Sequence, residues 1–364
     1  MRFPEFDGEW HHTTIGDCCS PLEYGMNAPA KEYDGANKYI RITDIDEDTC
    51  TYKCDDVVSP NAQLEDKYRV RKNDILFART GASTGKAYLY NEEDGLMYYA
   101  GFLIRGNVKP AYNAKFVFLQ TQTQKYKKWV DIMSIRSGQP GINSQEYSGF
   151  KFHLPPSKVE QDKISTLFTL LDERITTQIR IIDKLQSLMK GLAEHLTEFT
   201  PNIKIADCLN CHSSVLQENQ VKSEGKYKVY GANGICGYSD KPAILEDAIL
   251  IVKDGSGVGN VSYASGEYSV IGTSNYLTAK SGYSLKYLYY SLMVFNFIPY
   301  KTGMAIPHIY FKDYRKALIY CPSLDKQVQI ASLLSKIECK IEADKAIADF
   351  YQQQKRFLLQ SMFI

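Results

Sequence analysis

Two glycine-rich segments have the residue types and spacing closest to a known chemistry. Residues 81–87 read Gly-Ala-Ser-Thr-Gly-Lys-Ala, which has one residue too few between its glycines for a phosphate-binding loop and lacks the metal-binding Ser or Thr at its end. Residues 255–259 read Gly-Ser-Gly-Val-Gly, whose last interval is one residue short of a dinucleotide fingerprint. The sequence therefore argues against a nucleotide-binding site in either segment. Glycines followed by small polar residues also suit backbone amides that approach the phosphates of a nucleic acid, and a plain tight turn is the alternative.

Cysteines and histidines do not form a convincing site. Cys208, Cys211 and His212 have the spacing of a haem-attachment motif, but the match is only five residues long and we interpret it as chance. Cys50 and Cys54 lack the paired spacing that a zinc site with those cysteines would need. No nucleophile elbow or carboxylate pair stands out, so the sequence predicts a chain without a metal and without catalytic residues.

Composition limits the classes of protein further. The 364 residues predict about two domains, and 43 basic against 42 acidic residues give a net charge of +1, which excludes gross electrostatic adhesion to DNA or membranes. Any nucleic-acid contact must then use local patches, such as the basic residues that precede the first glycine loop, Lys67, Arg69, Arg71 and Lys72. No apolar run reaches membrane-spanning length, and nine cysteines without a framework or export signal predict reduced thiols in the cytoplasm.

The chain contains an internal repeat that must position these loops. Pro156-Ser157 and Pro322-Ser323 are 166 residues apart, and the same offset pairs apolar residues over about 40 positions. Each copy predicts a long helix that begins after its serine, and Glu160 would complete a capping box in the first copy only. A helix of this length cannot bury its apolar stripe alone, so we expect the two to form a coiled coil. The residues predicted to form this interface are Ile164, Leu167, Leu171, Ile182, Leu185, Leu192, Ile330, Leu333, Ile337, Ile341, Tyr351 and Leu358.

The segments before each long helix also match. Residues 74–86 align with residues 248–260, and each reads as a strand, a glycine-rich turn and the start of a second strand, which predicts a hairpin. Helices are predicted over 115–129 and 285–297, each followed by a glycine-bearing loop. We therefore predict an α+β protein in which two mixed α/β domains are spaced by two long helices in an antiparallel coiled coil, with pseudo-twofold symmetry. The predicted boundaries are 1–156 and 200–322 for the domains and 157–199 and 323–364 for the helices.

This combination resembles the specificity subunit of type I restriction-modification enzymes. The resemblance rests on the start at residues 2–10, the stretch Tyr-Gly-Ala-Asn-Gly-Ile at 230–235, the loop at 253–260, the Pro-Ser helix starts, and the ending Leu-Leu-Gln-Ser-Met-Phe-Ile at 358–364. It covers essentially the whole chain. It implies two target recognition domains, each reading one half of a split site in double-stranded DNA.

The resemblance also implies partners and the location of the chemistry. The helices would dock two methyltransferase subunits, and restriction subunits that translocate DNA would join them. S-adenosylmethionine, Mg²⁺ and ATP would then be bound by those partner subunits and not by this chain, which would be a non-catalytic cytoplasmic subunit without a membrane contact. The alternative is a coiled-coil scaffold or adaptor with repeated protein-binding domains.

We expect backbone amides and basic residues of the glycine loops to hold phosphates while nearby polar side chains read base edges. The first domain's candidates are Arg79, Thr80, Ser83 and Lys86, with Arg136, Gln139 and Asn143 from its later loop. The second domain's candidates are Asn233, Lys253, Ser256, Asn260 and His308.

Overall fold

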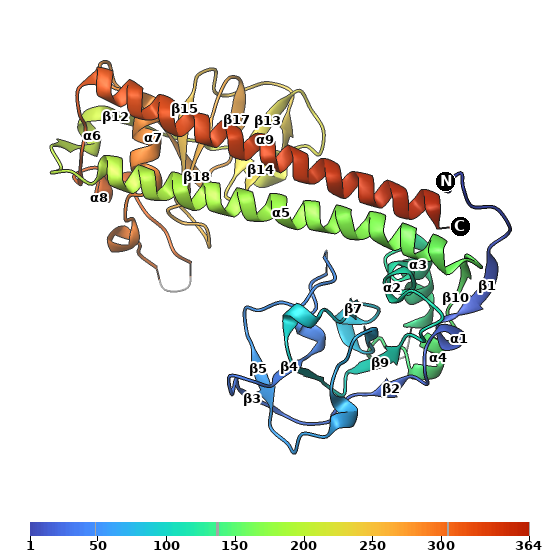
Figure 1. Cartoon of the computed structure of the whole chain (residues 1–364). Coiled ribbons are helices and arrows are strands. Elements are labelled where there is room, and N and C mark those ends of the chain that lie inside the picture. The colour runs from blue at the N-terminus through green and yellow to red at the C-terminus, as the bar shows by residue number, and fades with distance from the viewer. Residues whose placement is uncertain (48, 136–137, 304–305, 364) are drawn as a thin grey trace. The chain divides into compact units, whose positions relative to one another are not determined.

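A computed structural model describes residues 1–47, 49–135, 138–303 and 306–363 of the chain (Figure 1). The chain forms two compact units. Unit 1 consists of Met1–Thr177 with Ala348–Ile364, and unit 2 of Gln178–Ile347. Each unit therefore takes part of each long helix, α5 (Lys158–Thr197) and α9 (Leu324–Met362).

Unit 1 is built around a four-stranded sheet with the strand order β2-β9-β6-β7. Short strand pairs β1–β10, β3–β5 and β4–β8 flank it, and β4–β8 is parallel. Its strands are β1 (His11–Thr14), β2 (Glu23–Tyr24), β3 (Ala30–Glu32), β4 (Lys38–Ile40), β5 (Val58–Pro60), β6 (Asp74–Ala78), β7 (Ala87–Leu89), β8 (Met97–Tyr99), β9 (Leu103–Asn107) and β10 (Lys151–Leu154). Its helices other than the long ones are α1 (Ile15–Cys18), α2 (Ala114–Gln120), α3 (Gln124–Met133) and α4 (Ser144–Ser148).

Unit 2 repeats this topology. Its four-stranded sheet has the order β12-β18-β15-β16, and its parallel pair is β13–β17, to which β14 adds an edge. Its strands are β11 (Ile203–Lys204), β12 (Leu209–Ser213), β13 (Tyr227–Gly231), β14 (Gly234–Ser239), β15 (Ala248–Val252), β16 (Val261–Ala264), β17 (Tyr268–Val270), β18 (Ser274–Ala279) and β19 (Leu318–Ile319). Its short helices are α6 (Ile205–Cys208), α7 (Leu285–Met293) and α8 (Phe311–Tyr314).

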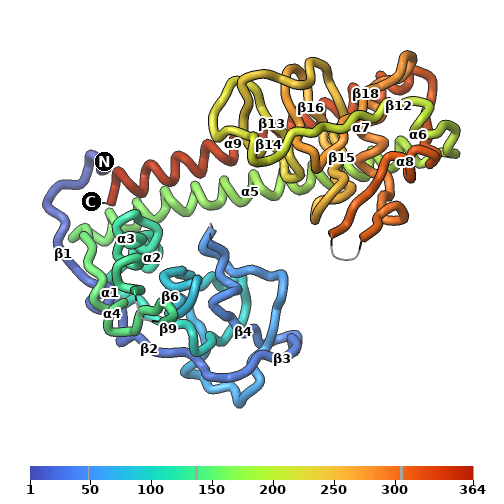
Figure 2. The backbone as a smooth tube through the Cα atoms, turned by 180° about the vertical axis from the view of Figure 1, so that it is seen from behind, coloured from blue at the N-terminus to red at the C-terminus, as the bar shows by residue number. Residues whose placement is uncertain are grey.

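The two long helices are antiparallel. In unit 1 the start of α5 packs against the end of α9, because Ile164 and Phe168 share a buried cluster with Leu359 and Met362. Figure 2 shows the first residues of the chain beside the end of α9, where the Met1 amino group donates a hydrogen bond to the Ser361 carbonyl. In unit 2 the end of α5 packs against the start of α9, where Ala193 shares a cluster with Ala331 and Leu334. The predicted coiled coil and its antiparallel direction are confirmed.

Three predictions about helices need correction. The helix predicted over 285–297 ends at Met293. The helix predicted over 115–129 is broken into α2 and α3, because Thr123 caps α3 by accepting a hydrogen bond from the Tyr126 amide and donates its own hydroxyl to the Gln120 carbonyl. Leu333 was predicted to lie in the helix interface, but it is 47% exposed while Leu334 is fully buried. The other predicted interface residues are buried or half-buried.

Matched polar contacts attach each unit's sheet domain to its long helix. Gln161 accepts a hydrogen bond from the Asn113 amide at the start of α2, and Gln327, 166 residues later, accepts one from the Ser284 amide at the start of α7. Both glutamines also donate to a proline carbonyl before their own helix. Since both are buried, these contacts fix the position of α2 and α7 on the long helices.

Candidate nucleic-acid interface

The two glycine loops have the same backbone hydrogen bonds. In unit 1 the Gly85 amide donates to the Ala78 carbonyl (3.0 Å) and the Ala78 amide to the Lys86 carbonyl (2.8 Å). In unit 2 Gly259 donates to Val252 (2.9 Å), and Val252 donates to Asn260 (3.0 Å). The strands on either side pair antiparallel, β6 with β7 and β15 with β16, so the predicted hairpins are confirmed.

A later loop is joined to each glycine loop in the same way. The Gly81 amide donates to the Pro140 carbonyl (3.0 Å), and the Ile142 amide donates to the Arg79 carbonyl (2.9 Å). In unit 2 Gly255 donates to Pro307 (3.0 Å), and Ile309 donates to Lys253 (2.9 Å). The structure therefore brings together the segments from which the site residues of each domain were predicted.

Gly81 is required by both conformation and space. Its φ is +70°, a left-handed conformation that side chains disfavour. A Cβ atom added at Gly81 would lie 2.9 Å from Nε2 of Gln139. In unit 2 a Cβ added at Gly257 would lie 3.7 Å from the Ala232 carbonyl oxygen, which places the turn that contains Asn233 beside the second glycine loop.

Arg79 and Lys253 are equivalent cations that no carboxylate neutralises. They lie at the same point of the repeated frame, directly after β6 and β15, and neither has an acidic partner within 4.0 Å in the part of the chain that the structure describes. The Arg79 guanidinium instead lies over the Tyr24 ring, 4.8 Å from its centroid. An unpaired cation beside a turn rich in backbone amides is suited to binding a phosphate or the edge of a guanine.

Other predicted site residues are engaged within the chain. Lys86 forms an ion pair with Glu47 at 3.2 Å, and Asn143 caps α4 by accepting a hydrogen bond from the Glu146 amide. The His308 ring packs against Tyr310, with a centroid separation of 5.0 Å. Among the others, Gln139, Asn233, Ser256 and Asn260 are exposed, and Thr80 and Ser83 are half-buried. Arg136 lies outside the described residues.

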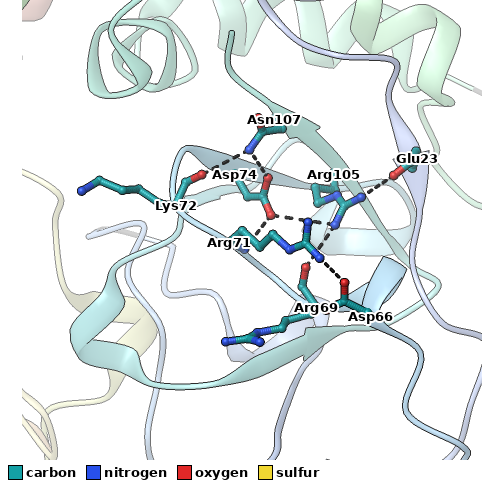
Figure 3. A network of polar contacts seen from close by, with 8 residues as sticks. All are labelled: Glu23, Asp66, Arg69, Arg71, Lys72, Asp74, Arg105 and Asn107. Atoms are coloured by element: carbon teal, nitrogen blue, oxygen red, sulfur yellow. Dashed lines mark hydrogen bonds and ion pairs between the residues drawn. The ribbon is translucent and has the colours of Figure 1, made fainter. Parts of the chain in front are cut away.

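The segment before the first glycine loop takes part in a network of polar contacts (Figure 3), and three of its four basic side chains are paired with acids. Arg71 pairs with Asp66, Lys67 with Glu65, and Lys72 with Glu92. Arg69 is exposed and has no acidic partner within 4.0 Å among the described residues, so it is the one member of this group whose charge is not paired.

Asp74, at the start of β6, is the buried centre of this network. It accepts hydrogen bonds from the Arg71 amide (2.7 Å) and the Asn107 side chain (2.7 Å), and Arg105 lies 4.0 Å away. Desolvation by burial raises the pKa of its carboxyl group. Because Asp74 ties β6 to β9, it fixes the strand that leads into the glycine loop.

The cysteine motif has no reactive thiol. Burial raises the pKa of Cys208 to about 12 and that of Cys211 to about 11, so both are protonated at neutral pH. Among the described residues, no group of three or more His, Cys, Asp or Glu side chains could hold a metal ion. None of the described helices is long and apolar enough to cross a membrane.

Sequence reasoning missed two exposed aromatic residues that contact Arg79, Tyr24 through its ring and Phe102 through its backbone carbonyl. Tyr24 is 42% exposed, and its hydroxyl accepts a hydrogen bond from the Ser144 amide. Phe102 is 58% exposed, and its carbonyl accepts a hydrogen bond from the Arg79 amide at 3.0 Å. Neither lies in a motif, and only the tertiary structure places them at the glycine loop.

Comparison with known proteins identifies the class to which this repeated architecture belongs. Residues 8–187 and 203–349 match the family described as type I restriction modification DNA specificity domain, and the chain belongs to this family. The description of the family names DNA specificity as its role, which agrees with the predicted non-catalytic subunit.

Particular relatives agree with this assignment. The chain is 24% identical over 112 residues to the type I restriction enzyme EcoprrI specificity subunit of Escherichia coli, an alignment that covers 31% of this chain and 28% of that protein. Its fold is similar to the crystal structure of a type I restriction-modification S subunit from M. genitalium, with a TM-score of 0.67, 16% identity, and coverage of 100% of this chain and 99% of the other. A structure from a study of type I R-M complex assembly and conformational transition matches with a TM-score of 0.56 and 15% identity, over 98% of this chain and 97% of that one.

Proposed function

We propose that this chain reads a bipartite target in double-stranded DNA, one half-site through each unit, with an unread spacer between the halves. The observation that carries the proposal is the repeated frame itself, in which two glycine loops with identical backbone contacts each present an unpaired cation, Arg79 or Lys253. Since the side chains around the two cations differ, the two half-sites are expected to differ in sequence.

We further propose that the long helices dock two methyltransferase subunits, which restriction subunits then join. Apolar side chains that are exposed on these helices support a protein partner, including Leu170, Phe350 and Phe357 of unit 1 at 54%, 64% and 57% exposure. Methyl transfer to a base inside a duplex requires that the base be flipped out and S-adenosylmethionine be bound. In this proposal the partner subunits supply both, and they also bind Mg²⁺ and ATP.

Exchange of one recognition domain tests the assignment of reading. Residues 1–153 are replaced by the corresponding domain of another family member, and the chimaera is assembled with the cognate methyltransferase. The methylated bases in genomic DNA are then sequenced. The first half-site should change and the second should stay the same. Methylation of the unchanged first half-site would disprove the assignment.

The scaffold alternative predicts a different response to salt. A DNA-reading chain assembled with its methyltransferase should show affinity for duplex DNA that falls steeply with salt, because bound phosphates release counterions. An adaptor should add no salt-sensitive affinity to that of the methyltransferase alone. Filter binding with and without this chain, over a range of salt concentrations, separates the two.

A further inference from the structure

The repeated frame assigns Phe102 and Thr273 to the same position in the two units. The Arg79 amide donates to the Phe102 carbonyl (3.0 Å), and the Lys253 amide donates to the Thr273 carbonyl (2.9 Å). The residue before each is a glycine whose amide also donates to a carbonyl, Gly101 to Met26 (2.7 Å) and Gly272 to Leu216 (2.8 Å). The backbone hydrogen bonds at this position are thus the same in both units, but Phe102 is exposed whereas Thr273 is half-buried with its Oγ1 enclosed.

The Phe102 side chain is presented outward by a rigid backbone. Its neighbours Ala100 and Leu103 are buried, whereas Phe102 is 58% exposed. Both backbone amides that flank the turn are bonded, since Gly101 donates to Met26 and Leu103 donates to Ala100 (2.8 Å). A large apolar side chain fixed in this way cannot easily fold back into the core of unit 1.

Two polar side chains of the loop that adjoins Phe102 are of types that read bases in the major groove. The Arg79 backbone amide donates to the Phe102 carbonyl, and its side chain has no acidic partner within 4.0 Å among the described residues; Gln139 lies against Gly81 of the same loop. Arginine reads guanine and glutamine reads adenine by paired hydrogen bonds in the major groove. The apolar group that the major groove offers is the 5-methyl group of thymine, which apolar side chains such as phenylalanine contact.

We propose that Phe102 contacts the 5-methyl group of a thymine in the half-site read by unit 1. This inference rests on the proposed function, because it names the chemistry that one unit reads. Unit 2 has the half-buried Thr273 at the equivalent position, so its half-site should lack an aromatic contact of this kind.

The test removes the methyl group from the DNA and the ring from the protein. The full chain is assembled with its methyltransferase. Binding is then measured to duplexes that carry the motif identified by sequencing the methylated bases of genomic DNA. In these duplexes the thymines of the half-sites are replaced one at a time by deoxyuridine. Loss of one buried methyl group should weaken wild-type binding about fourfold at a single position of the first half-site. Phe102→Ala should bind the thymine duplex more weakly and should no longer distinguish thymine from deoxyuridine there. Phe102→Leu, which keeps an apolar side chain, should retain part of the discrimination.

Leu64→Ala is the matched control, since Leu64 is another exposed apolar side chain of unit 1, at 39% exposure. It should leave the ratio of thymine to deoxyuridine affinity unchanged. The inference is overturned if Phe102→Ala keeps the wild-type ratio of thymine to deoxyuridine affinity. This includes equal weakening of binding to both duplexes, which is expected if the ring inserts between bases. It is also overturned if Phe102→Ala impairs assembly with the methyltransferase. If the wild-type complex recognises no motif at all, the proposed function fails. If it recognises the motif but Phe102→Ala does not change the discrimination between thymine and deoxyuridine, only the present inference fails.

Discussion

At the scale of single residues, the site depends on which charged side chains the fold leaves without a partner. Lys67, Arg71 and Lys72 are all paired with acids, whereas Arg79 and Lys253 have no acidic partner among the residues that the structure describes. Basic residues that are close in sequence therefore differ in what they can offer to DNA. Their counts in the sequence do not reveal this difference.

Replacement of the unpaired cation should weaken DNA binding with a measurable salt signature. Arg79→Ala should lower affinity and, where Arg79 holds a phosphate, reduce the slope of log affinity against log salt by about 1. Where Arg79 reads a base, it should instead relax specificity at one position, at a cost of about 1–3 kcal/mol. Lys67→Ala is the control, because Lys67 is already paired with Glu65. Equal effects of the two substitutions on DNA affinity would contradict the assignment.

Gly81→Ala should disturb the loop without disrupting the core. The left-handed φ and the close approach of Gln139 both oppose a Cβ atom, so we expect a loss of about 1 kcal/mol in stability and a larger loss of recognition. Urea unfolding and DNA binding measure the two effects. Gly138→Ala, in the later loop with nothing within 4 Å, should change stability little. A Gly81→Ala protein with normal DNA binding would show that the loop geometry does not matter for recognition.

At the scale of elements, equivalent ion pairs join each recognition domain to its long helix. Lys115 at the start of α2 pairs with Asp172 of α5 at 2.6 Å, and Lys286 at the start of α7 pairs with Glu338 of α9 at 2.9 Å. Asp172 and Glu338 are related by the same offset of 166 residues that relates the helices. Tyr289 and Tyr290 also donate to Glu338, so the second attachment uses an aromatic pair that the first lacks.

Removal of one of these attachments should loosen one unit. Lys286→Met leaves Glu338 half-buried without its cation, and we expect a loss of about 1–2 kcal/mol in unfolding free energy. Lys190→Met is the control, since Lys190 forms an exposed pair with Glu194 along one helix and should cost less than about 0.5 kcal/mol. Urea unfolding of the full chain measures both. Equal losses would show that the domain attachment is no stronger than a surface pair.

The attachment in unit 1 should also depend on pH. Although burial by itself raises the pKa of Asp172, Lys115 and Lys355 more than compensate, and the net pKa lies below the ordinary value of 3.8. A carboxyl group with a lowered folded-state pKa stabilises the protein fully above its unfolded pKa, and this contribution is lost as the pH falls toward the folded pKa. The difference in unfolding free energy between the wild type and Asp172→Asn should therefore shrink as the pH falls below about 4. A constant difference between pH 7 and pH 3 would contradict this.

At the scale of the whole molecule, unit 1 is assembled from two segments that are far apart in the sequence, whereas unit 2 is one continuous segment. Unit 1 needs Leu359 and Met362 from α9 to cover Ile164 and Phe168 of α5. Because α5 and α9 are repeats of one another, a second copy of α5 offers a similar apolar face.

We therefore predict that a fragment of residues 1–199 self-associates. Its α5 would lack α9 and should pair antiparallel with the α5 of a second copy, since this buries the exposed stripe. Analytical ultracentrifugation should show a dimer, and Phe168→Asp in the fragment should reduce its association. A monomeric, folded fragment would show that α9 is dispensable to unit 1.

The sequence predicted the elements better than the contacts. The long helices and hairpins could be predicted because apolar periodicity and glycine turns are local signals. The exposure of Leu333 was not predicted because the phase of the buried stripe shifts along a long helix. A shift of one residue is enough to bury Leu334 and expose Leu333. The partners of Lys86, the cap at Asn143 and the exposed aromatics at Tyr24 and Phe102 depend on tertiary contacts or on side-chain geometry that no motif specifies.

The division of unit 1 between distant segments has a consequence for synthesis on the ribosome. Residues 348–362 complete the apolar cluster of unit 1, yet they are translated after every element of unit 2 other than α9. The apolar face of α5 in unit 1 therefore stays uncovered while the second recognition domain is synthesised. Nascent chains of this protein are expected to need protection at that face, and premature termination would leave it open to association with other chains.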